Sequence, residues 1–561
     1  MSKFVIYQVI PRLFGNQNTT PKHNGTIEEN GCGKFNSFTP KALKEIKSLG
    51  VSHIWYTGVI EHATQTDYTA HGIKKDHPAV VKGKAGSAYA IKDYYDVDPD
   101  LAENVENRMA EFESLVKRTH KADLKMLIDF VPNHVARQYH SDVKPKGVKD
   151  LGETDHSEWA FSPLNNFYYL PNQAFSPQFN IDGYTEFPAK ATGNDQFTAS
   201  PTKNDWYETV KLNYGVNYVE GSQKQFNPIP DTWFKMRDIL LFWAKKKVDG
   251  FRCDMAEMVP VEFWSWAIGQ VKVQFPEIIF IAEVYNPSEY RNYICNGKFD
   301  FLYDKVGMYD MLRKITSKNY PVFDITNTWQ SLGGIENKML NFLENHDEQR
   351  IGSGFFSGNG LYAKPAMIVA ATLTQGPVMV YFGQELGEKG MYNEGFSGVD
   401  GRTTIFDYWG VKSIQNWINN GQFDGLRLTT EQKNLREFYR KLLQITLSEK
   451  AITDGVMYDL EFANFDNSKF NSHEQFAYFR KYESELLLIV LNFHDKHLET
   501  EIHFPLEAFQ YLNMEEGHHY SCVNLLDPTE QFAEININSN EVFRTDIVAW
   551  EGKILKLKQL D

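Results

Sequence analysis

The sequence predicts an α/β protein: a (β/α)8 barrel with a domain inserted after its third strand and an antiparallel β-sandwich at its C-terminal end. Three observations support this prediction. Short β-type apolar runs alternate with longer amphipathic segments through most of the chain. Between the third strand and the next convincing helix lies a long stretch rich in Asn, Pro, Gly and aromatic residues. After about residue 450 the helical pattern gives way to strands of alternating polarity.

Each barrel strand is predicted from a short run of apolar and β-branched residues. The runs are Phe4–Val9, Val51–Tyr56, Leu124–Phe130, Val248–Asp254, Glu277–Glu283, Phe299–Tyr303, Met339–Asn345 and Pro377–Phe382. Apolar residues at three- and four-residue steps predict helices over Lys41–Leu49, Met109–Ala122, Thr232–Lys246, Val261–Val273 and Ala366–Thr374. Eight strands that alternate with helices indicate a closed barrel rather than an open sheet.

The domain limits follow from where these patterns change. We assign residues 1–134 and 206–450 to the barrel, 135–205 to the inserted domain and 451–561 to the C-terminal sandwich. A structureless loop as long as the insertion is uncommon in a compact enzyme, so a small domain at the barrel mouth is the better interpretation. The sandwich is predicted from strands such as Gln475–Arg480 and Leu486–Phe493, which follow a helix near Glu431–Leu447.

Charge and composition narrow the classes of partner. The chain has 58 Lys and Arg against 73 Asp and Glu, a net charge of −15, which argues against nucleic acid or an anionic membrane as partner. The longest apolar runs, such as Leu486–Leu491, are far shorter than the roughly 20 residues of a membrane span. The first residues, Met1–Val9, resemble a strand rather than a secretory signal, and the four cysteines are scattered. We therefore expect a cytoplasmic protein with reduced thiols.

Carboxylates follow four of the predicted strands at their C-terminal ends, where a barrel keeps its active site. The segments are Asp129–His134, Gly250–Asp254, Phe280–Val284 and Glu344–Arg350. A single strand-end Asp often only caps the next helix. Buried acids are costly without partners, so four acidic strand ends at one rim indicate a functional site.

These four segments resemble, in order and spacing, the four signature regions of the α-amylase family of glycoside hydrolases (family 13). Tyr7–Phe14, Leu49–Trp55 and Gly376–Glu385 extend the resemblance to the first, second and eighth strands, so that it covers essentially the whole chain. The resemblance implies the barrel fold, an oligosaccharide or polysaccharide substrate and chemistry that requires no cofactor.

The resemblance also implies catalytic roles. Asp254 matches the nucleophile that forms a covalent glycosyl-enzyme, Glu283 the general acid/base, and Asp347 the carboxylate that stabilises the transition state. The implied outcome is retention of configuration, which needs two carboxylates about 5–5.5 Å apart. Because successive strand residues point to opposite faces, we expect Arg252 and Asp254 to project together into the mouth and Cys253 away from it. The guanidinium should then favour the ionised form of Asp254.

Arg252 and four further residues match substrate-binding positions of the family. His134 and His346 match histidines that hydrogen-bond the reacting sugar, and Tyr89 matches the tyrosine that stacks beneath it. Arg350 matches one half of a clamp that holds the terminal sugar in exo-acting α-glucosidases. The other half is an Asp directly after the tyrosine, and here that position is Ala90, which disfavours a strict exo-glucosidase.

The sequence leaves open whether the protein binds a structural calcium ion. Asn133 matches a position that ligates calcium in many relatives, but a calcium site needs about six to eight oxygens. Glu257-Met258 stands where calcium-dependent α-amylases typically carry Lys-His.

These matches favour an α-amylase-like hydrolase of α-1,4-glucans and maltooligosaccharides. A predicted first strand near the start of the sequence disfavours cyclomaltodextrinases, neopullulanases and branching enzymes, which carry an N-terminal β-domain. A 4-α-glucanotransferase or another transglycosidase is the alternative, because Glu257-Met258 leaves the acceptor side undetermined. A non-catalytic binding subunit is disfavoured, since such relatives lack the nucleophile or the acid. The sequence does not predict an oligomeric state.

Overall fold

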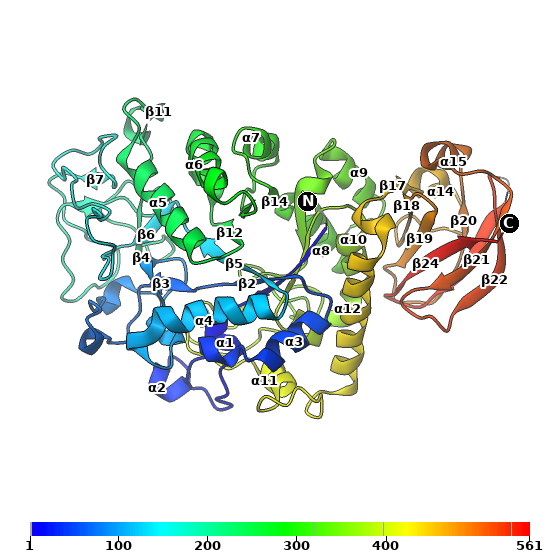
Figure 1. Cartoon of the computed structure of the whole chain (residues 1–561), viewed down its shortest axis with the longest axis horizontal. Coiled ribbons are helices and arrows are strands. Elements are labelled where there is room, and N and C mark those ends of the chain that lie inside the picture. Colours follow the sequence, from blue (N-terminus) through cyan, green and yellow to red (C-terminus); the bar gives the residue numbers. More distant parts are fainter. Residues whose placement is uncertain (1–2, 319, 397, 540, 561) are drawn as a thin grey trace.

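The predicted barrel strands form one closed parallel barrel in the computed structural model, which describes residues 3–318, 320–396, 398–539 and 541–560 (Figure 1). The order around the barrel is β1-β16-β15-β14-β13-β12-β5-β2. The strands are β1 (Val5–Val9), β2 (His53–Tyr56), β5 (Lys125–Phe130), β12 (Gly250–Cys253), β13 (Ile279–Ala282), β14 (Phe301–Tyr303), β15 (Met339–Phe342) and β16 (Val378–Tyr381). Each strand lies within its predicted segment, which confirms the fold class.

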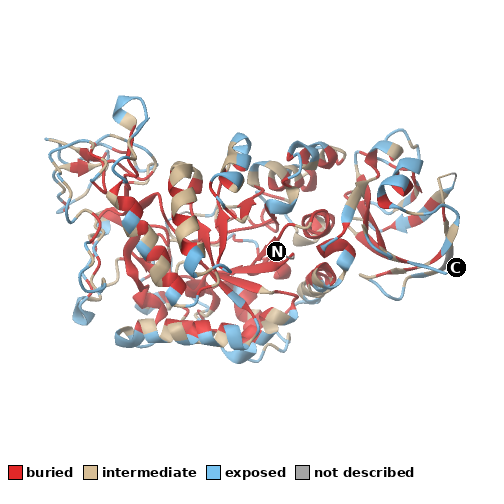
Figure 2. Ribbon diagram, turned by 45° about the horizontal axis from the view of Figure 1, so that its top comes forward, coloured by how far each residue is buried: buried red, intermediate tan, exposed pale blue. Residues whose placement is uncertain are grey.

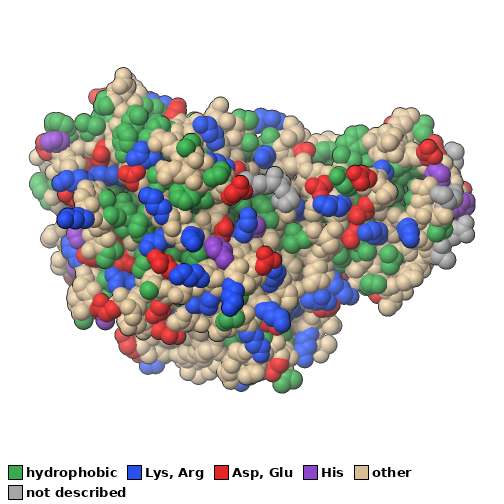
Figure 3. Space-filling view, in the orientation of Figure 1, with side chains coloured by type: hydrophobic (Ala, Val, Ile, Leu, Met, Phe, Trp, Pro, Cys, Tyr) green, Lys and Arg blue, Asp and Glu red, His purple; other side chains and the backbone are tan. Residues whose placement is uncertain are grey.

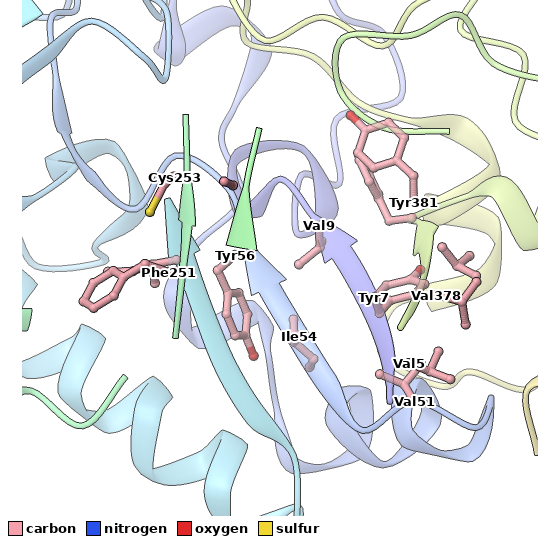
Figure 4. Close-up of a cluster of buried hydrophobic side chains, with 14 of the residues drawn as sticks. Val5, Tyr7, Val9, Val51, Ile54, Tyr56, Phe251, Cys253, Val378 and Tyr381 are labelled. Carbon is pink, nitrogen blue, oxygen red and sulfur yellow. The ribbon is translucent and has the colours of Figure 1, made fainter. Parts of the chain in front are cut away.

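Alternation along the strands separates two buried clusters. On β1, Ile6 packs in the barrel interior with residues such as Trp55 and Ile281. Val5 and Tyr7, one residue to either side of Ile6, belong to the larger cluster between the strands and the surrounding helices (Figure 4). The barrel is therefore a packed core, and its functional groups can gather only beyond the strand ends.

Helices cover the outside of the barrel. The main ones are α3 (Pro40–Ser48), α4 (Arg108–Lys121), α5 (Asp231–Lys245), α6 (Val261–Gln274), α7 (Tyr290–Cys295), α8 (Asp310–Thr316), α9 (Asp324–Ser331), α10 (Lys364–Thr372), α11 (Lys412–Ile418) and α12 (Thr430–Ser448). Local sequence fixes their starts: Thr39 Oγ1 accepts a hydrogen bond from the backbone N–H of Ala42 at the start of α3. Thr429 and Gln432 form a reciprocal capping box at the start of α12. All five helices expected within the barrel are present, and so is the helix predicted near Glu431–Leu447.

The segment between β5 and α5 forms small antiparallel sheets at one end of the molecule, at the left of Figure 1. The pairs are β6 (His134–Ala136) with β9 (Thr209–Lys211), β7 (Tyr169–Leu170) with β8 (Ala189–Lys190), and β10 (Val216–Asn217) with β11 (Gln223–Lys224). We expected the barrel to resume at residue 206. Residues 209–224 instead contribute strands to these sheets, and the barrel pattern resumes with α5 at Asp231. A further hairpin, β3 (Ile60–His62) with β4 (Ile91–Val97), follows β2.

The C-terminal part is an antiparallel sandwich, as predicted. Its larger sheet has the order β17-β18-β19-β24-β21-β22, and β20 pairs with β23. The strands are β17 (Val456–Asp459), β18 (Gln475–Tyr482), β19 (Glu485–Asn492), β20 (Leu498–His503), β21 (His518–Asn524), β22 (Gln531–Ile537), β23 (Val542–Ile547) and β24 (Gly552–Gln559), with the helix α15 (Leu506–Leu512) between β20 and β21. Phe479 and Leu488 pack inside the sandwich, whereas Tyr478 and Ile489 belong to the same buried cluster as the barrel. The ribbon coloured by burial shows buried stretches in the strands of both the barrel and the sandwich (Figure 2).

One arginine joins the barrel to this sandwich. The guanidinium of Arg480, on β18, is 2% exposed and donates hydrogen bonds of 2.8–2.9 Å to four backbone carbonyls. The carbonyls belong to Leu373, Ala451, Ile452 and Gly455. The sheet is thus fixed to the chain that leaves α10 and to the segment that follows α12.

The surface carries charges of both signs interspersed over the face drawn in Figure 3. Within the described ranges, no helix has the length and apolar character needed to cross a membrane. The four cysteines, Cys32, Cys253, Cys295 and Cys522, are all free, as expected.

Candidate active site

A cavity of about 410 Å³ lies beyond the carboxyl ends of the barrel strands and reaches the inserted segment. Five carboxylates line it: Asp254, Glu283, Asp347, Glu208 and Glu348. The other lining residues are Tyr89, Trp206, Tyr285, Phe406, Lys82, Ser87, His134, Thr209, Met255 and Ile405. The expected catalytic carboxylates and two expected sugar-binding residues, Tyr89 and His134, therefore meet in one place.

Arg252 is the centre of the carboxylate cluster. Its Nη1 donates a 2.7 Å hydrogen bond to Asp254 Oδ1, and its Nη2 lies 2.8 Å from Glu283 Oε2. Asp347 Oδ2 is 4.0 Å from the same Nη2, and Asp129 Oδ1 is 3.4 Å from Nη1. The alternation of β12 brings Arg252 and Asp254 to one side, while Cys253 packs in the outer cluster of Figure 4, as expected.

Aromatic rings enclose the guanidinium. The rings of Trp55, Tyr89 and Tyr303 have centroids 5.3–5.4 Å from its central carbon, and Tyr303 Oη accepts a hydrogen bond from Arg252 Nε at 3.2 Å. Negative ring faces and four carboxylates keep this buried cation charged, and the pKa of Arg252 is raised above its ordinary value despite burial. The arginine can thus hold the cluster in a fixed geometry.

Asp254 is 6% exposed, and its protonation is governed first by burial. Burial raises the pKa of this carboxyl well above its usual range; Arg252 opposes the shift, and the charges of Glu283 and Asp347 add to it. Arg252 thus favours the ionised form of Asp254, as expected, but the effect of burial on the pKa is larger. The cluster without substrate therefore tends to retain a proton among its carboxylates.

Glu283 follows β13 directly and is held at both carboxylate oxygens. The hydroxyl group of Tyr285 donates a hydrogen bond of 2.6 Å to Oε1, and the backbone N–H of Met255 donates one of 2.7 Å to Oε2. Met255, next to Asp254, adopts a left-handed backbone (φ 41°), which is strained for a residue with a side chain. The strain lies in the turn that brings this N–H to the carboxylate.

Asp347 lines the cavity, whereas His346, a predicted sugar-binding residue, contacts Asp347 but is not one of the described residues that line the cavity. His346 Nε2 lies 3.0 Å from Asp347 Oδ2, and its ring stacks on Tyr89 with centroids 5.0 Å apart. Burial raises the pKa of Asp347, but the stronger combined effect of His346, which bonds it, and of nearby arginines lowers that pKa to about 2. Gln8 at the end of β1 holds the other ring nitrogen of His346 at 2.8 Å. Asp347 therefore remains ionised in neutral solution.

His134 lies on the side of the cavity formed by the inserted segment. Its ring faces Trp206 at a centroid distance of 5.2 Å, and burial together with the charge of Lys211 lowers its pKa to about 3. A neutral imidazole can both donate and accept hydrogen bonds with sugar hydroxyls. Tyr89 and Trp206 offer the aromatic faces of the cavity.

Arg350 does not line the cavity. It is fully buried, donates to Glu344 Oε2 and Thr403 Oγ1 at 2.8 Å each, and lies over the ring of Tyr381. Its placement does not support the expected contact with substrate. Arg402 lies nearer the site and donates from Nε to the backbone carbonyl of Asp347 at 2.7 Å.

Asn133, the expected calcium ligand, lies behind the cavity wall. Its Oδ1 accepts a hydrogen bond from Lys211 Nζ at 2.6 Å, and its Nδ2 donates to the carbonyl of Gly193 at 2.8 Å. A separate buried group, Glu61, Asp93 and Asp96, has oxygen ligands close enough together for a metal. Asp96 is already paired with Arg108.

Several residues of the cavity are not predicted from the sequence. Tyr285 lies two residues after Glu283, so the alternation that placed Arg252 beside Asp254 could have suggested it. Trp206, Glu208 and Lys82 come from loops and from the irregular insertion, where no periodicity marks them.

Known proteins resemble the chain over this whole architecture. A family model described as the alpha amylase catalytic domain matches residues 8–404. Alpha-amylase 3 of Dictyoglomus thermophilum is 24% identical over 427 residues, which cover 72% of this chain and 74% of that protein. Trehalose-6-phosphate hydrolase of Bacillus subtilis is 23% identical and is matched over 90% of this chain and 91% of its own length.

Solved structures share the fold at low identity. A maltogenic alpha-amylase from Thermotoga neapolitana has a TM-score of 0.62 at 19% identity, covering 100% of this chain and 99% of its own. An alpha-amylase from Geobacillus thermoleovorans in complex with acarbose has a TM-score of 0.64 at 16% identity, with the same coverage. Because the family model spans more than half of the sequence and the signature carboxylates meet in one cavity, the chain belongs to the α-amylase family of glycoside hydrolases.

Proposed function

We propose that this protein is a retaining glycoside hydrolase that cleaves α-1,4-glucans, with maltooligosaccharides as substrates. The observation that carries the proposal is the meeting of Asp254, Glu283 and Asp347 around the single guanidinium of Arg252 in one cavity. Asp254 and Glu283 contact the two terminal nitrogens of one planar group, which holds their carboxylates close together. This arrangement fits the shorter carboxylate separation of retaining enzymes better than the longer one of inverting enzymes.

In the proposed reaction, Asp254 attacks the anomeric carbon of the bound sugar while Glu283 gives its proton to the leaving glycosidic oxygen. The bond to the leaving sugar breaks as the bond to Asp254 Oδ forms, and Asp347 stabilises the positive charge that develops on the ring. Glu283 then takes a proton from water, which attacks the same carbon and frees Asp254. This sequence requires Glu283 to carry a proton when the substrate binds.

The charge of the cavity favours a neutral sugar over a sugar phosphate. Five carboxylates line it, and its lining cation, Lys82, lies 3.0 Å from Glu208 and is thereby neutralised. A phosphate group would meet this negative field without an unpaired cation among the lining residues that the structure describes. We therefore propose unphosphorylated glucans, although one similar protein is named for a phosphorylated disaccharide.

The location that we propose is the cytoplasm. The four free cysteines fit a reducing compartment.

The test is product analysis on maltoheptaose, with the anomeric configuration followed by NMR in the first minutes. We expect shorter maltooligosaccharides released as α-anomers. Products longer than the substrate would make the protein a glucanotransferase, and an untouched substrate would refute the assignment to α-1,4-glucans.

The nucleophile is tested by Asp254→Asn, which keeps the shape of the side chain and removes its charge. We expect turnover to fall by about three orders of magnitude or more with the fold intact. Asp123→Asn, at a side chain that is 93% exposed, is the matched control and should leave turnover unchanged. If Asp254→Asn kept most of the activity, the proposed mechanism would be wrong.

A further inference from the structure

The position expected to ligate calcium is filled by a side chain of the protein itself. Lys211 belongs to β9, which pairs with β6 so that Lys211 lies opposite His134. Its ammonium group lies 2.6 Å from Asn133 Oδ1 and 2.6 Å from Asp195 Oδ1, and its side chain is only 2% exposed. The ring of Tyr218 lies 5.5 Å from the same nitrogen.

These contacts do not fit a calcium ion. Calcium takes six to eight oxygens at about 2.3–2.6 Å, so an ion bound to Asn133 Oδ1 and Asp195 Oδ1 would need the space that the ammonium occupies. Such a calcium ion would also be in contact with the positively charged ammonium group of Lys211. The carbonyl of Gly193, another oxygen beside Asn133, already accepts a hydrogen bond from Asn133 Nδ2.

The contacts of Lys211 join three parts of the chain that a bridging cation would join. Asn133 follows β5 of the barrel, Asp195 lies in the inserted segment, and Lys211 is on the strand that returns from it. The backbone N–H of Leu212, the next residue, donates to the carbonyl of Asn133 at 2.9 Å and completes the connection.

We propose that the ammonium group of Lys211 replaces a structural calcium ion between the barrel and the inserted segment, so that this protein folds and works without calcium. The proposal does not depend on the proposed substrate, because it concerns the stability of the protein and can be measured without one. It assigns to Lys211 the role of a fixed internal cation.

The first test is thermal unfolding of the full chain in excess EGTA and in millimolar CaCl2. We expect the same Tm in both, and no calcium retained by the purified protein in elemental analysis. A Tm that falls in EGTA and recovers with calcium would overturn the proposal.

The second test removes the ammonium group with Lys211→Met. We expect a Tm lower by a few degrees, because Asn133 Oδ1 and Asp195 Oδ1 lose their shared cation. The matched control is Lys224→Met, at an exposed lysine that pairs with Glu262, and it should leave Tm unchanged. If the two variants were equally stable, the proposal would fail.

A third variant tests the contact between Lys211 and Asp195 if Lys211→Met does not fold. Asp195→Asn affects a side chain that is 39% exposed and removes only the charge that faces Lys211. We expect a smaller decrease in Tm that is still the same in EGTA and in CaCl2. An Asp195→Asn protein with the Tm of the unmodified chain would contradict the cross-link.

Discussion

A carboxylate placed at residue 90 tests whether the terminal-sugar clamp of exo-acting relatives can be rebuilt here. On the sequence alone, Ala90→Asp should pair with Arg350 and shift the products toward single glucose units. The structure predicts a different result. Ala90 is 1% exposed, and Arg350 is already paired with Glu344. The side chains that pack with Ala90 are Ala63, Val81 and Ala136.

The cost of this substitution can be worked out from the burial. An Asp in the unfolded chain has a pKa of about 3.9, and an apolar site keeps the native carboxyl protonated. At pH 7 the ionisation of the unfolded chain then lowers the free energy of unfolding by 1.36 × (7 − 3.9), or about 4 kcal/mol. The added volume costs about 1–3 kcal/mol more. Ala90→Asn adds similar volume without the charge, so the difference between the two variants isolates the electrostatic part.

The sign of the pH effect follows from the raised native pKa. The free energy of unfolding of Ala90→Asp is lower than that of Ala90→Asn only at pH values above the pKa of the Asp in the unfolded chain. This difference decreases as the pH falls, to about 1 kcal/mol at pH 4.5. Calorimetric unfolding of both variants at pH 7 and pH 4.5 measures it, and maltoheptaose products report on the clamp. Equal stability of the two variants at pH 7, or a product profile shifted to glucose, would refute the reasoning.

Two further perturbations follow from single contacts. Tyr285→Phe removes a 2.6 Å hydrogen bond to Glu283, so kcat/KM on maltoheptaose should fall about 10- to 150-fold, whereas exposed Tyr320→Phe should change nothing. An unchanged kcat/KM would show that this bond does not support catalysis. Burial and, secondarily, Lys125 lower the pKa of His53 to about 3. As the pH falls from about 6.5 toward 3, the native state should lose about 1.4 kcal/mol per pH unit relative to His53→Gln. Calorimetry of the unmodified protein and of His53→Gln from pH 7 to 4.5 should show this loss. Parallel stability curves for the two proteins would contradict it.

The barrel and the centre of its site were predictable because they depend on local periodicity. Alternation along β12 determines that Arg252 and Asp254 share a side, and the strand ends determine that Glu283 joins them. No contact over a long distance in the sequence is needed for either conclusion.

The rest depends on contacts between distant segments. Asn133 and Lys211 are 78 residues apart, and nothing near Asn133 in the sequence indicates which group its oxygen meets. Arg350 has the residue type and spacing of a substrate ligand. Its guanidinium instead donates hydrogen bonds to the buried side chains of Glu344 and Thr403 and does not line the cavity. The insertion ends later in the structure than the sequence predicts, because β9 and β10 have only two or three residues each, too few for a periodic pattern.

The position of β24 has a consequence for how the protein matures during synthesis. This strand, residues 552–559, lies between β19 and β21 in the middle of its sheet, and its Ile554 belongs to the buried cluster shared with the barrel. The sheet therefore cannot close until those residues have left the ribosome. Until then, the apolar surface of β19 has no neighbour on that side and is exposed to chaperones and to other nascent chains. The three carboxylates that we propose as catalytic are all synthesised by residue 347, and the packing is thus completed only some two hundred residues later.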